Sequence, residues 1–256
     1  LDEILGYHLG QAARYRSELG QGDDGLATAA GARLTSAGTR AVSRGDFIAA
    51  RGLLGRAVEL LGAGTPQRVT ALTWFGIALY ALSEFDDADQ AWTEAIESGE
   101  GDDATVAFFE RVRVRGHNPI GGETNPELEV AVRERLAALS DDTPPLVFAS
   151  GYHSLARLHF WAGRTDDQLE AARQARDYAR RAGVVSLEAS AASIMGTALM
   201  YGASPWSEYE AYAKSLLDER DRLGRLAASA LAGLAASASH QGRHEEASEL
   251  FAQHMS

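Results

Sequence analysis

Apolar residues recur along this chain at spacings of three, four and seven, which is the pattern of amphipathic helices. The clearest stretch predicts two helices joined by a short turn that ends at Phe85. Each helix carries an apolar face of mixed small and large residues: Leu72, Phe75, Gly76 and Leu79 on the first, and Ala88, Trp92 and Ala95 on the second. Because two helices approach closely only where the facing side chains are small, Gly76 and Ala88 predict a helical hairpin.

An equivalent hairpin precedes this one, since Gly38 lies 38 positions before Gly76 and Ala57 lies 38 positions before Ala95. Its pattern is Leu34, Gly38, Ala41, a turn at 45–47, and then Ala50, Leu54 and Ala57. Three later units are less regular: Tyr152, Leu155, Ala156, Leu169, Ala172 and Ala175, with Gln168 where a small residue is expected; Ala192, Gly196 and Leu199; and Leu231, Leu234, Ala235, Ala238, Ala247 and Phe251. A period of this length predicts a stack of helical hairpins.

The segment between the second and third units has no clear register. We expect a helix over 104–115, a Gly- and Pro-rich loop over 116–122, an N-cap at Thr124 or Asn125, and a second helix from Pro126 to about Leu139. Two interpretations stay open: a functional insertion, or a bridge between two halves of the stack. The expected organisation is a connecting helix in 1–22, repeats in 23–102, the irregular hairpin in 103–142 and further repeats in 143–256, with about twelve helices in one continuous array.

Composition supports a helical protein and narrows its surroundings. The apolar fraction is 45%, supplied mainly by the strong helix formers Ala and Leu, and there are only six prolines. No cysteine is present, which excludes disulfides and cysteine-based metal sites. The net charge of −12 argues against direct nucleic-acid contact, and no apolar run reaches the roughly 20 residues that span a bilayer. We therefore expect a cytoplasmic protein, and the Leu1 start and the helical pattern at 253–256 indicate a fragment.

Motifs for catalysis, cofactors or metals are not found in the sequence. There is no phosphate-binding P-loop, Lys214 is the single lysine, and no Gly-x-Ser-x-Gly nucleophile turn occurs. His240 and His244 have a metal-ligand spacing, but Gly242 between them marks a turn that breaks the helix. The acidic residues between 86 and 103 are typical of solvated helix faces and helix N-termini. We expect no catalytic residue, no cofactor and no metal.

A concave groove is where stacked helical hairpins bind their partners, and its wall is formed by first-helix residues. By the repeat register these residues are Thr35, Thr39, Thr73, Ile77, Tyr80, His153, Arg157, Phe160, Ser193 and Thr197. Arg157, His153 and Tyr80 together suit an anionic or peptide ligand. The alternative is that all ten are ordinary residues of a groove wall.

These repeats resemble the tetratricopeptide repeat (TPR) family over residues 24–100 and 145–256. The resemblance implies an all-α, right-handed superhelical solenoid. A narrower resemblance is carried by three stretches, EILGYHLGQAARYRSEL at 3–19, ALMYGAS at 198–204 and GRHEEASELF at 242–251. They look like the repeat region of large actinobacterial signalling ATPases, either of the adenylate-cyclase type or of the LuxR-type and antibiotic-regulatory transcriptional regulators.

The resemblance implies a non-catalytic scaffold that binds protein or peptide partners as the C-terminal regulatory part of such an ATPase. Relatives that hold a peptide carboxylate use Lys and Asn in the groove, whereas this chain has Thr, Ile and His there. The alternative function is a small-molecule (inducer) sensor, because inducer-binding helical repeats occur in such regulators. Any cyclase or ATPase activity is expected upstream of this segment.

Overall fold

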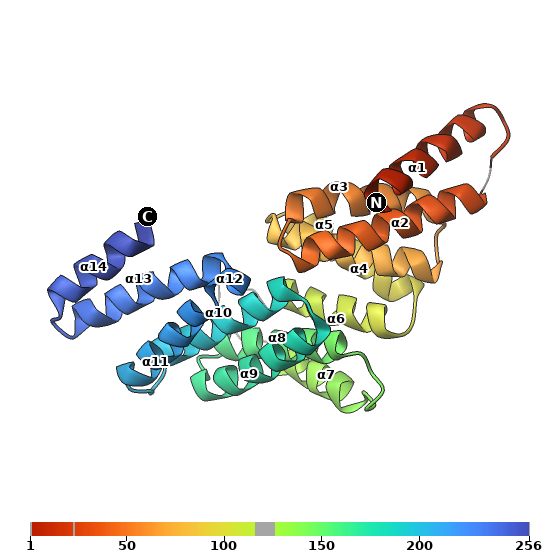
Figure 1. Ribbon diagram of the computed structural model, residues 1–256. Helices are drawn as coiled ribbons and strands as arrows, with labels where there is room; N and C mark the ends of the chain where they lie inside the picture. The colour runs from red at the N-terminus through yellow and green to blue at the C-terminus, as the bar shows by residue number, and fades with distance from the viewer. Residues whose placement is uncertain (1, 23, 116–125, 256) are drawn as a thin grey trace.

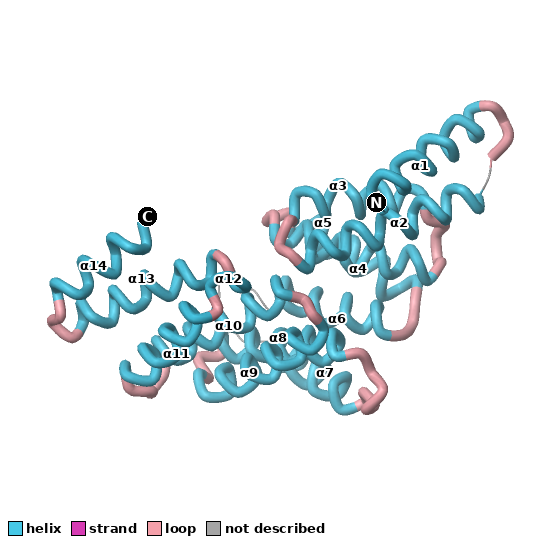
Figure 2. Tube along the Cα trace, in the orientation of Figure 1, coloured by secondary structure: helices cyan, strands magenta, loops and turns pink. Residues whose placement is uncertain are grey.

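The computed structural model describes residues 2–22, 24–115 and 126–255, and every regular element in these ranges is a helix (Figures 1 and 2). None of the described helices is long and apolar enough to cross a membrane. The 14 helices of the described ranges are α1 Asp2–Glu18, α2 Asp24–Ser43, α3 Phe47–Leu60, α4 Pro66–Ala81, α5 Phe85–Ser98, α6 Asp102–Arg115, α7 Pro126–Ala137, α8 Pro145–Trp161, α9 Thr165–Ala182, α10 Val185–Tyr201, α11 Trp206–Asp218, α12 Arg220–Leu223, α13 Arg225–His240 and α14 His244–Met255.

Successive helices form antiparallel pairs, as the sequence pattern predicted. The largest contacts join neighbours in the chain: α1 with α2, α2 with α3, α4 with α5, α8 with α9, α9 with α10, and α13 with α14. In the two clearest units the predicted small residues are buried, with Ala50, Ala57, Ala88 and Ala95 fully inaccessible. These pairs are consistent with a helical-repeat domain.

The turns inside the pairs share one backbone geometry. Gly45, Gly163 and Gly242 have φ of 79°, 68° and 76°, the left-handed conformation that ends a helix. After Gly45, the N–H of Asp46 donates to the carbonyl of Ala41 at 2.9 Å, which satisfies a carbonyl left free by the helix end. The same bond follows the other two glycines. This geometry explains why the predicted turn positions hold glycine.

Gln168, the residue that broke the small-residue pattern, has a specific role. Its side chain is buried at the start of α9, and its Nε2 donates to the carbonyl of Ile194 in α10 at 3.1 Å. The hydrogen bond offsets the cost of burying the amide. A polar side chain therefore replaces the small residue and ties two neighbouring pairs together.

The middle of the chain departs from simple pairing. α6 packs against α4, α5 and α8, and α7 packs against α8. The loop at 116–122 and the N-cap at Thr124 or Asn125 lie outside the described residues. The described ranges hold 14 helices where about twelve were expected. One of the additional helices is α12, a separate element of four residues that is too short to show a period in the sequence.

The first half of the chain folds back onto the second half. In Figure 1, α1–α5 form one group, α6–α10 lie below it, and α11–α14 continue away from both. Val42 of α2 and Trp74 of α4 belong to the same buried apolar cluster as Leu187 of α10 and Val184 just before it. Because α2 also contacts α10 directly, the first helices of distant pairs meet around a common centre.

Candidate functional site

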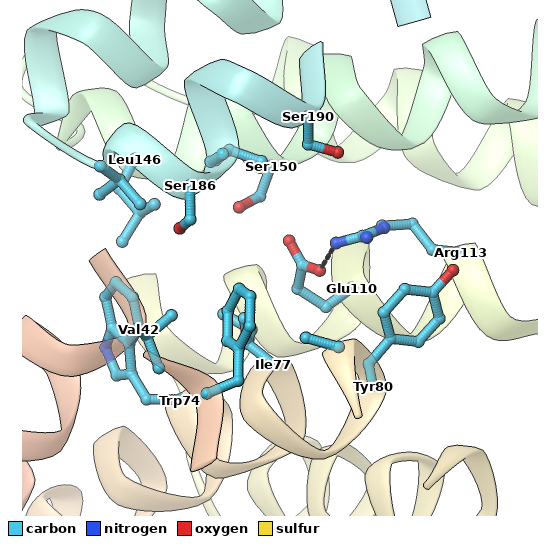
Figure 3. Close-up of a pocket in the computed structure, with 14 residues that line it drawn as sticks. Val42, Trp74, Ile77, Tyr80, Glu110, Arg113, Leu146, Ser150, Ser186 and Ser190 are labelled. Carbon is cyan, nitrogen blue, oxygen red and sulfur yellow. Dashed lines mark hydrogen bonds and ion pairs between the residues drawn. The ribbon is translucent and has the colours of Figure 1, made fainter. Parts of the chain in front are cut away.

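A cavity of about 340 Å³ lies where these first helices meet. Side chains from α2, α3, α4, α6, α8 and α10 line it, so it draws on segments from residue 42 to residue 190 (Figure 3). We call it the central cavity. Its volume is in the range of about 300–1,000 Å³ that is typical of small-molecule sites.

Most of the central cavity wall is apolar. The apolar residues are Val42, Phe47, Trp74, Ile77, Ala81, Leu146, Val184 and Leu187. Figure 3 shows Val42, Trp74 and Leu146 gathered at one side of the space. Trp74 and Leu187 are also part of the core that joins α4 to α10, so this side of the wall is held by packing on both halves of the chain.

The opposite side of the cavity carries a buried ion pair. Arg113 and Glu110 of α6 are joined by a hydrogen bond, and their side chains are only 12% and 2% exposed. The guanidinium of Arg113 also lies over the ring of Tyr80, 4.6 Å from its centroid. Figure 3 shows all three side chains at this end, away from Trp74. The cavity is thus apolar at one side and charged at the other.

Buried polar atoms without hydrogen-bond partners gather at the charged side. Of the six such atoms in the described part of the chain, Oγ of Ser150 and Nε of Arg113 belong to residues that line the cavity, and Nδ1 of His153 and Nε of Arg157 lie beside it. The other two belong to His159 and Arg176. The Ser150 side chain is fully buried, and Figure 3 shows its hydroxyl pointing into the cavity. Each such atom has lost water without gaining a protein partner, which costs about 1–3 kcal/mol. A ligand that supplied acceptors would recover that cost at the two donors that line the cavity, Ser150 and Arg113.

His153 lies behind this side of the cavity and stays neutral. It is fully buried, and burial, together with Arg113 and Arg157, lowers its pKa well below 6.5. Its Nε2 lies 2.8 Å from Oγ of Ser190, a cavity residue. We assign the proton to Nε2, because the other tautomer would leave a buried N–H donor at Nδ1 unpaired, and such donors are rarer than unpaired acceptors. The hydroxyl hydrogen of Ser190 is then free to donate to a ligand.

Four of the ten groove residues expected from the sequence lie at or beside the central cavity. Ile77 and Tyr80 line it, and His153 is hydrogen-bonded to the cavity residue Ser190. Arg157 does not line the cavity, but it is near enough to Arg113 and Tyr80 for their charges to affect its pKa, which burial lowers below its usual value. Its guanidinium lies 5.8 Å from the Trp161 ring centroid, and it forms no ion pair within the described ranges.

The other six are placed elsewhere. Thr35 and Thr73 are buried, and their hydroxyls donate to carbonyls of their own helices. Thr39 is half-buried on α2. Ser193 and Thr197 line a second hollow of about 210 Å³ between α10, α11 and α13. Phe160 packs edge to face on Trp161, with ring centroids 4.9 Å apart.

The sequence pattern missed the charged pair and two serines of the cavity. Glu110 and Arg113 lie in the segment without a register, so no groove position was assigned there. Ser150 and Ser190 are on first helices, but a buried serine is indistinguishable in sequence from a small packing residue. One signal was present: an ion pair three residues apart on α6, next to the apolar residues Phe109 and Val112.

Comparison with known proteins identifies no relative. A scan against protein-family models found no match, and a search of curated proteins found no similar sequence. Within the described ranges, no three His, Asp or Glu side chains lie close enough together to hold a metal ion. The central cavity and the repeat pattern are therefore the features of the chain that bear on its function.

Proposed function

We propose that this chain is a small-molecule-binding helical-repeat module, and that the central cavity is its ligand site. The observation that carries the proposal is the cavity itself, at which buried unpartnered polar atoms face an apolar wall. Ligand sites in proteins combine these features, since apolar surface supplies affinity and a few polar groups fix orientation. The sequence pattern alone favoured a peptide-binding groove, with a sensor as the alternative.

The position of the cavity suits a sensor. One wall comes from α2–α4 and the other from α8–α10, so a ligand touches both halves of the chain at once. A ligand that contacts both walls binds the closed arrangement more tightly than an opened one. It therefore shifts the population toward the closed form, and this shift is the signal that the rest of the protein would receive.

The resemblance to TPR regions of signalling ATPases and transcriptional regulators agrees with this role. In such a parent protein the module would be the C-terminal regulatory part, located in the cytoplasm, and the bound effector would alter how the repeats act on the upstream domains. The TPR assignment and the regulator belong to the proposal. The paired helices and the 38-residue spacing support it.

Binding of a protein or peptide partner stays a prediction of the sequence. The central cavity is about twice the ~150 Å³ cavity that accommodates one benzene molecule, which suits a compact ligand better than an extended peptide. Contact of α2 with α10 across the first-helix face also interrupts the groove. Partner binding by Tyr80 and Arg157 remains testable by pull-down with the double alanine variant.

The direct test is a thermal-shift screen of metabolites with a cavity-filling variant. Ser186 lines the cavity and forms no hydrogen bond with any described residue, so Ser186→Leu should fill space without removing a contact. Ser207→Leu on the exposed face of α11 is the matched control. A ligand at 100 times its Kd should stabilise the native chain and the control by about 2.7 kcal/mol, and the filled variant far less.

Two results would contradict the proposed function. One is a screen in which no compound at millimolar concentration shifts the melting temperature. The other is a ligand that stabilises the Ser186→Leu variant as well as the native chain, because that ligand would bind elsewhere.

A further inference from the structure

The two sides of the central cavity define the ligand class, and each side constrains a different part of the molecule. The apolar side, with Trp74, suits a flat ring system (Figure 3). The volume of about 340 Å³ is roughly twice that of a cavity filled by one benzene ring, so two fused rings fit.

The charge at the other side is positive. Arg113 and Arg157 each contribute one positive charge, Glu110 contributes one negative charge, and His153 is neutral. Glu110 is already hydrogen-bonded to Arg113, while Arg157 has no carboxylate partner in the described part of the chain. One positive charge, that of Arg157 beside the cavity, is therefore left without a neutralising group near the polar side.

The unpartnered atoms at this side are mainly donors. Nε of Arg113 and Oγ of Ser150 both carry a hydrogen with no acceptor among the described residues, and the hydroxyl of Ser190 is free to donate. Donors beside an excess positive charge recognise an oxyanion. A single excess charge matches a carboxylate better than a phosphate monoester, which carries about −1.5 to −2 at neutral pH.

We propose that the central cavity binds a small aromatic carboxylate of about two rings, with the ring against Trp74 and the carboxylate against Arg113 and Ser150. This inference rests on the small-molecule function proposed above. Glu110 then positions Arg113, and Arg157 supplies long-range attraction from beside the site.

The test compares three probes that share one ring and differ in charge: 2-naphthoate, 2-naphthamide and 2-naphthylmethylamine. Each is titrated into the whole chain by calorimetry. We expect 2-naphthoate to bind at least about tenfold more tightly than the amide, and the amine to bind most weakly, because a charged hydrogen bond outweighs a neutral one by that factor.

Two variants assign the preference to the named residues. Glu110→Gln combined with Arg113→Met removes the charged pair without leaving one buried charge alone, and should abolish the preference for naphthoate over naphthamide. Arg157→Met changes a partly exposed residue and should reduce the preference for naphthoate. It serves as the test if the double variant does not fold. Arg44→Met, an exposed arginine outside the cavity, should leave all three affinities unchanged.

The outcomes separate the ligand class from the binding function. Equal affinity for naphthoate and naphthamide, or tightest binding of the amine, overturns the carboxylate inference and leaves small-molecule binding intact. A naphthoate preference that persists in both the double variant and Arg157→Met also overturns it. If none of the probes binds at about 1 mM, the ligand inference fails, while the metabolite screen with the Ser186→Leu variant still decides the proposed function.

Discussion

Gly76 of α4 lies directly against the indole of Trp92 in α5. A Cβ placed on Gly76 would lie 2.3 Å from the indole nitrogen, and that nitrogen donates to the carbonyl of Thr73 at 3.1 Å. The preceding repeat has the same relationship, since a Cβ on Gly38 would lie 2.5 Å from Cγ of Leu54. Leu54 and Trp92 are also 38 positions apart, so both the close approach and its partner repeat.

Replacing Gly76 by alanine should destabilise the fold, although alanine is the better helix former. The added methyl must displace a fully buried indole, and overpacking of this kind costs about 1–3 kcal/mol. Gly196→Ala is the matched control, because a Cβ there lies 3.7 Å from Tyr212, an ordinary contact. That change should stabilise the protein by about 0.5–1 kcal/mol. Urea denaturation measures the change in the free energy of unfolding for both variants. Changes of the same sign in Gly76→Ala and Gly196→Ala would refute the packing argument.

Ser83 is in a position where its equivalents are glycine. It has φ of 66°, and the next residue, Glu84, donates to the carbonyl of Leu79 at 2.9 Å as in the glycine turns. The left-handed conformation costs a non-glycine residue about 1–2 kcal/mol. Glycine avoids this cost, but it also raises the conformational entropy of the unfolded chain, which offsets part of the gain. Ser83→Gly should therefore stabilise by about 0.5–1 kcal/mol, and Gly45→Ser should destabilise by a similar amount. Melting temperatures that move in the opposite directions would contradict this.

Glu188 in α10 is the buried centre of an ion-pair network. Its side chain is 1% exposed and bonded to Arg180 at 2.9 Å and to Arg222, and Arg176 lies 3.8 Å away. Glu188→Ala leaves Arg176, Arg180 and Arg222 to share the one remaining carboxylate, that of Glu219. The loss of the buried carboxylate should cost about 1–3 kcal/mol in the free energy of unfolding. Glu246→Ala, which removes a carboxylate 47% exposed and paired with Arg243, should cost about 0–1 kcal/mol. Similar losses in the two variants would show that the network contributes little.

Stability should fall as the pH drops below 6.5. The pKa of His153 is lowered by its burial, and that of His159 is lowered in the same way, so the unfolded chain takes up protons that the folded chain does not. Each such histidine lowers the free energy of unfolding by up to about 1.4 kcal/mol for each pH unit below its pKa in the unfolded chain, until the pH reaches its pKa in the folded chain.

The His153→Asn variant should have a shallower slope of stability against pH between 6.5 and 5. The asparagine side chain does not titrate, and it retains a polar group near Ser190. The exposed His8→Asn variant should keep the native slope. Urea denaturation at several pH values measures both, and an unchanged slope in His153→Asn would contradict the assignment.

Much of the local architecture could be predicted from sequence because it depends on near neighbours. Helix pairing follows from spacings of three, four and seven, and turn positions follow from glycines that adopt positive φ, as at Gly45 and Gly242. Close approach at Gly76 was predictable for the same reason. α12 was missed, since four residues carry no period.

The candidate site could be predicted only in part. Ile77 and Tyr80 were found because they follow the repeat register of α4. The partners that give the cavity its charge, Glu110 and Arg113, were not found because α6 has no register to compare with. Their importance depends on the packing of α6 against α4 and α8, and nothing in the spacing of α6 reports those contacts.

By itself, the sequence determined that the chain is helical, where several of the turns lie, and which small residues face a neighbouring helix. These features depend on backbone preferences and on contacts within one or two turns. The tertiary structure decided that α2 meets α10 and that a charged pair on α6 faces an apolar wall. The contact of α2 with α10 joins residues more than a hundred positions apart, and the wall that faces the charged pair is assembled from α2, α4, α8 and α10. The curvature that brings these helices together is the sum of many small packing angles.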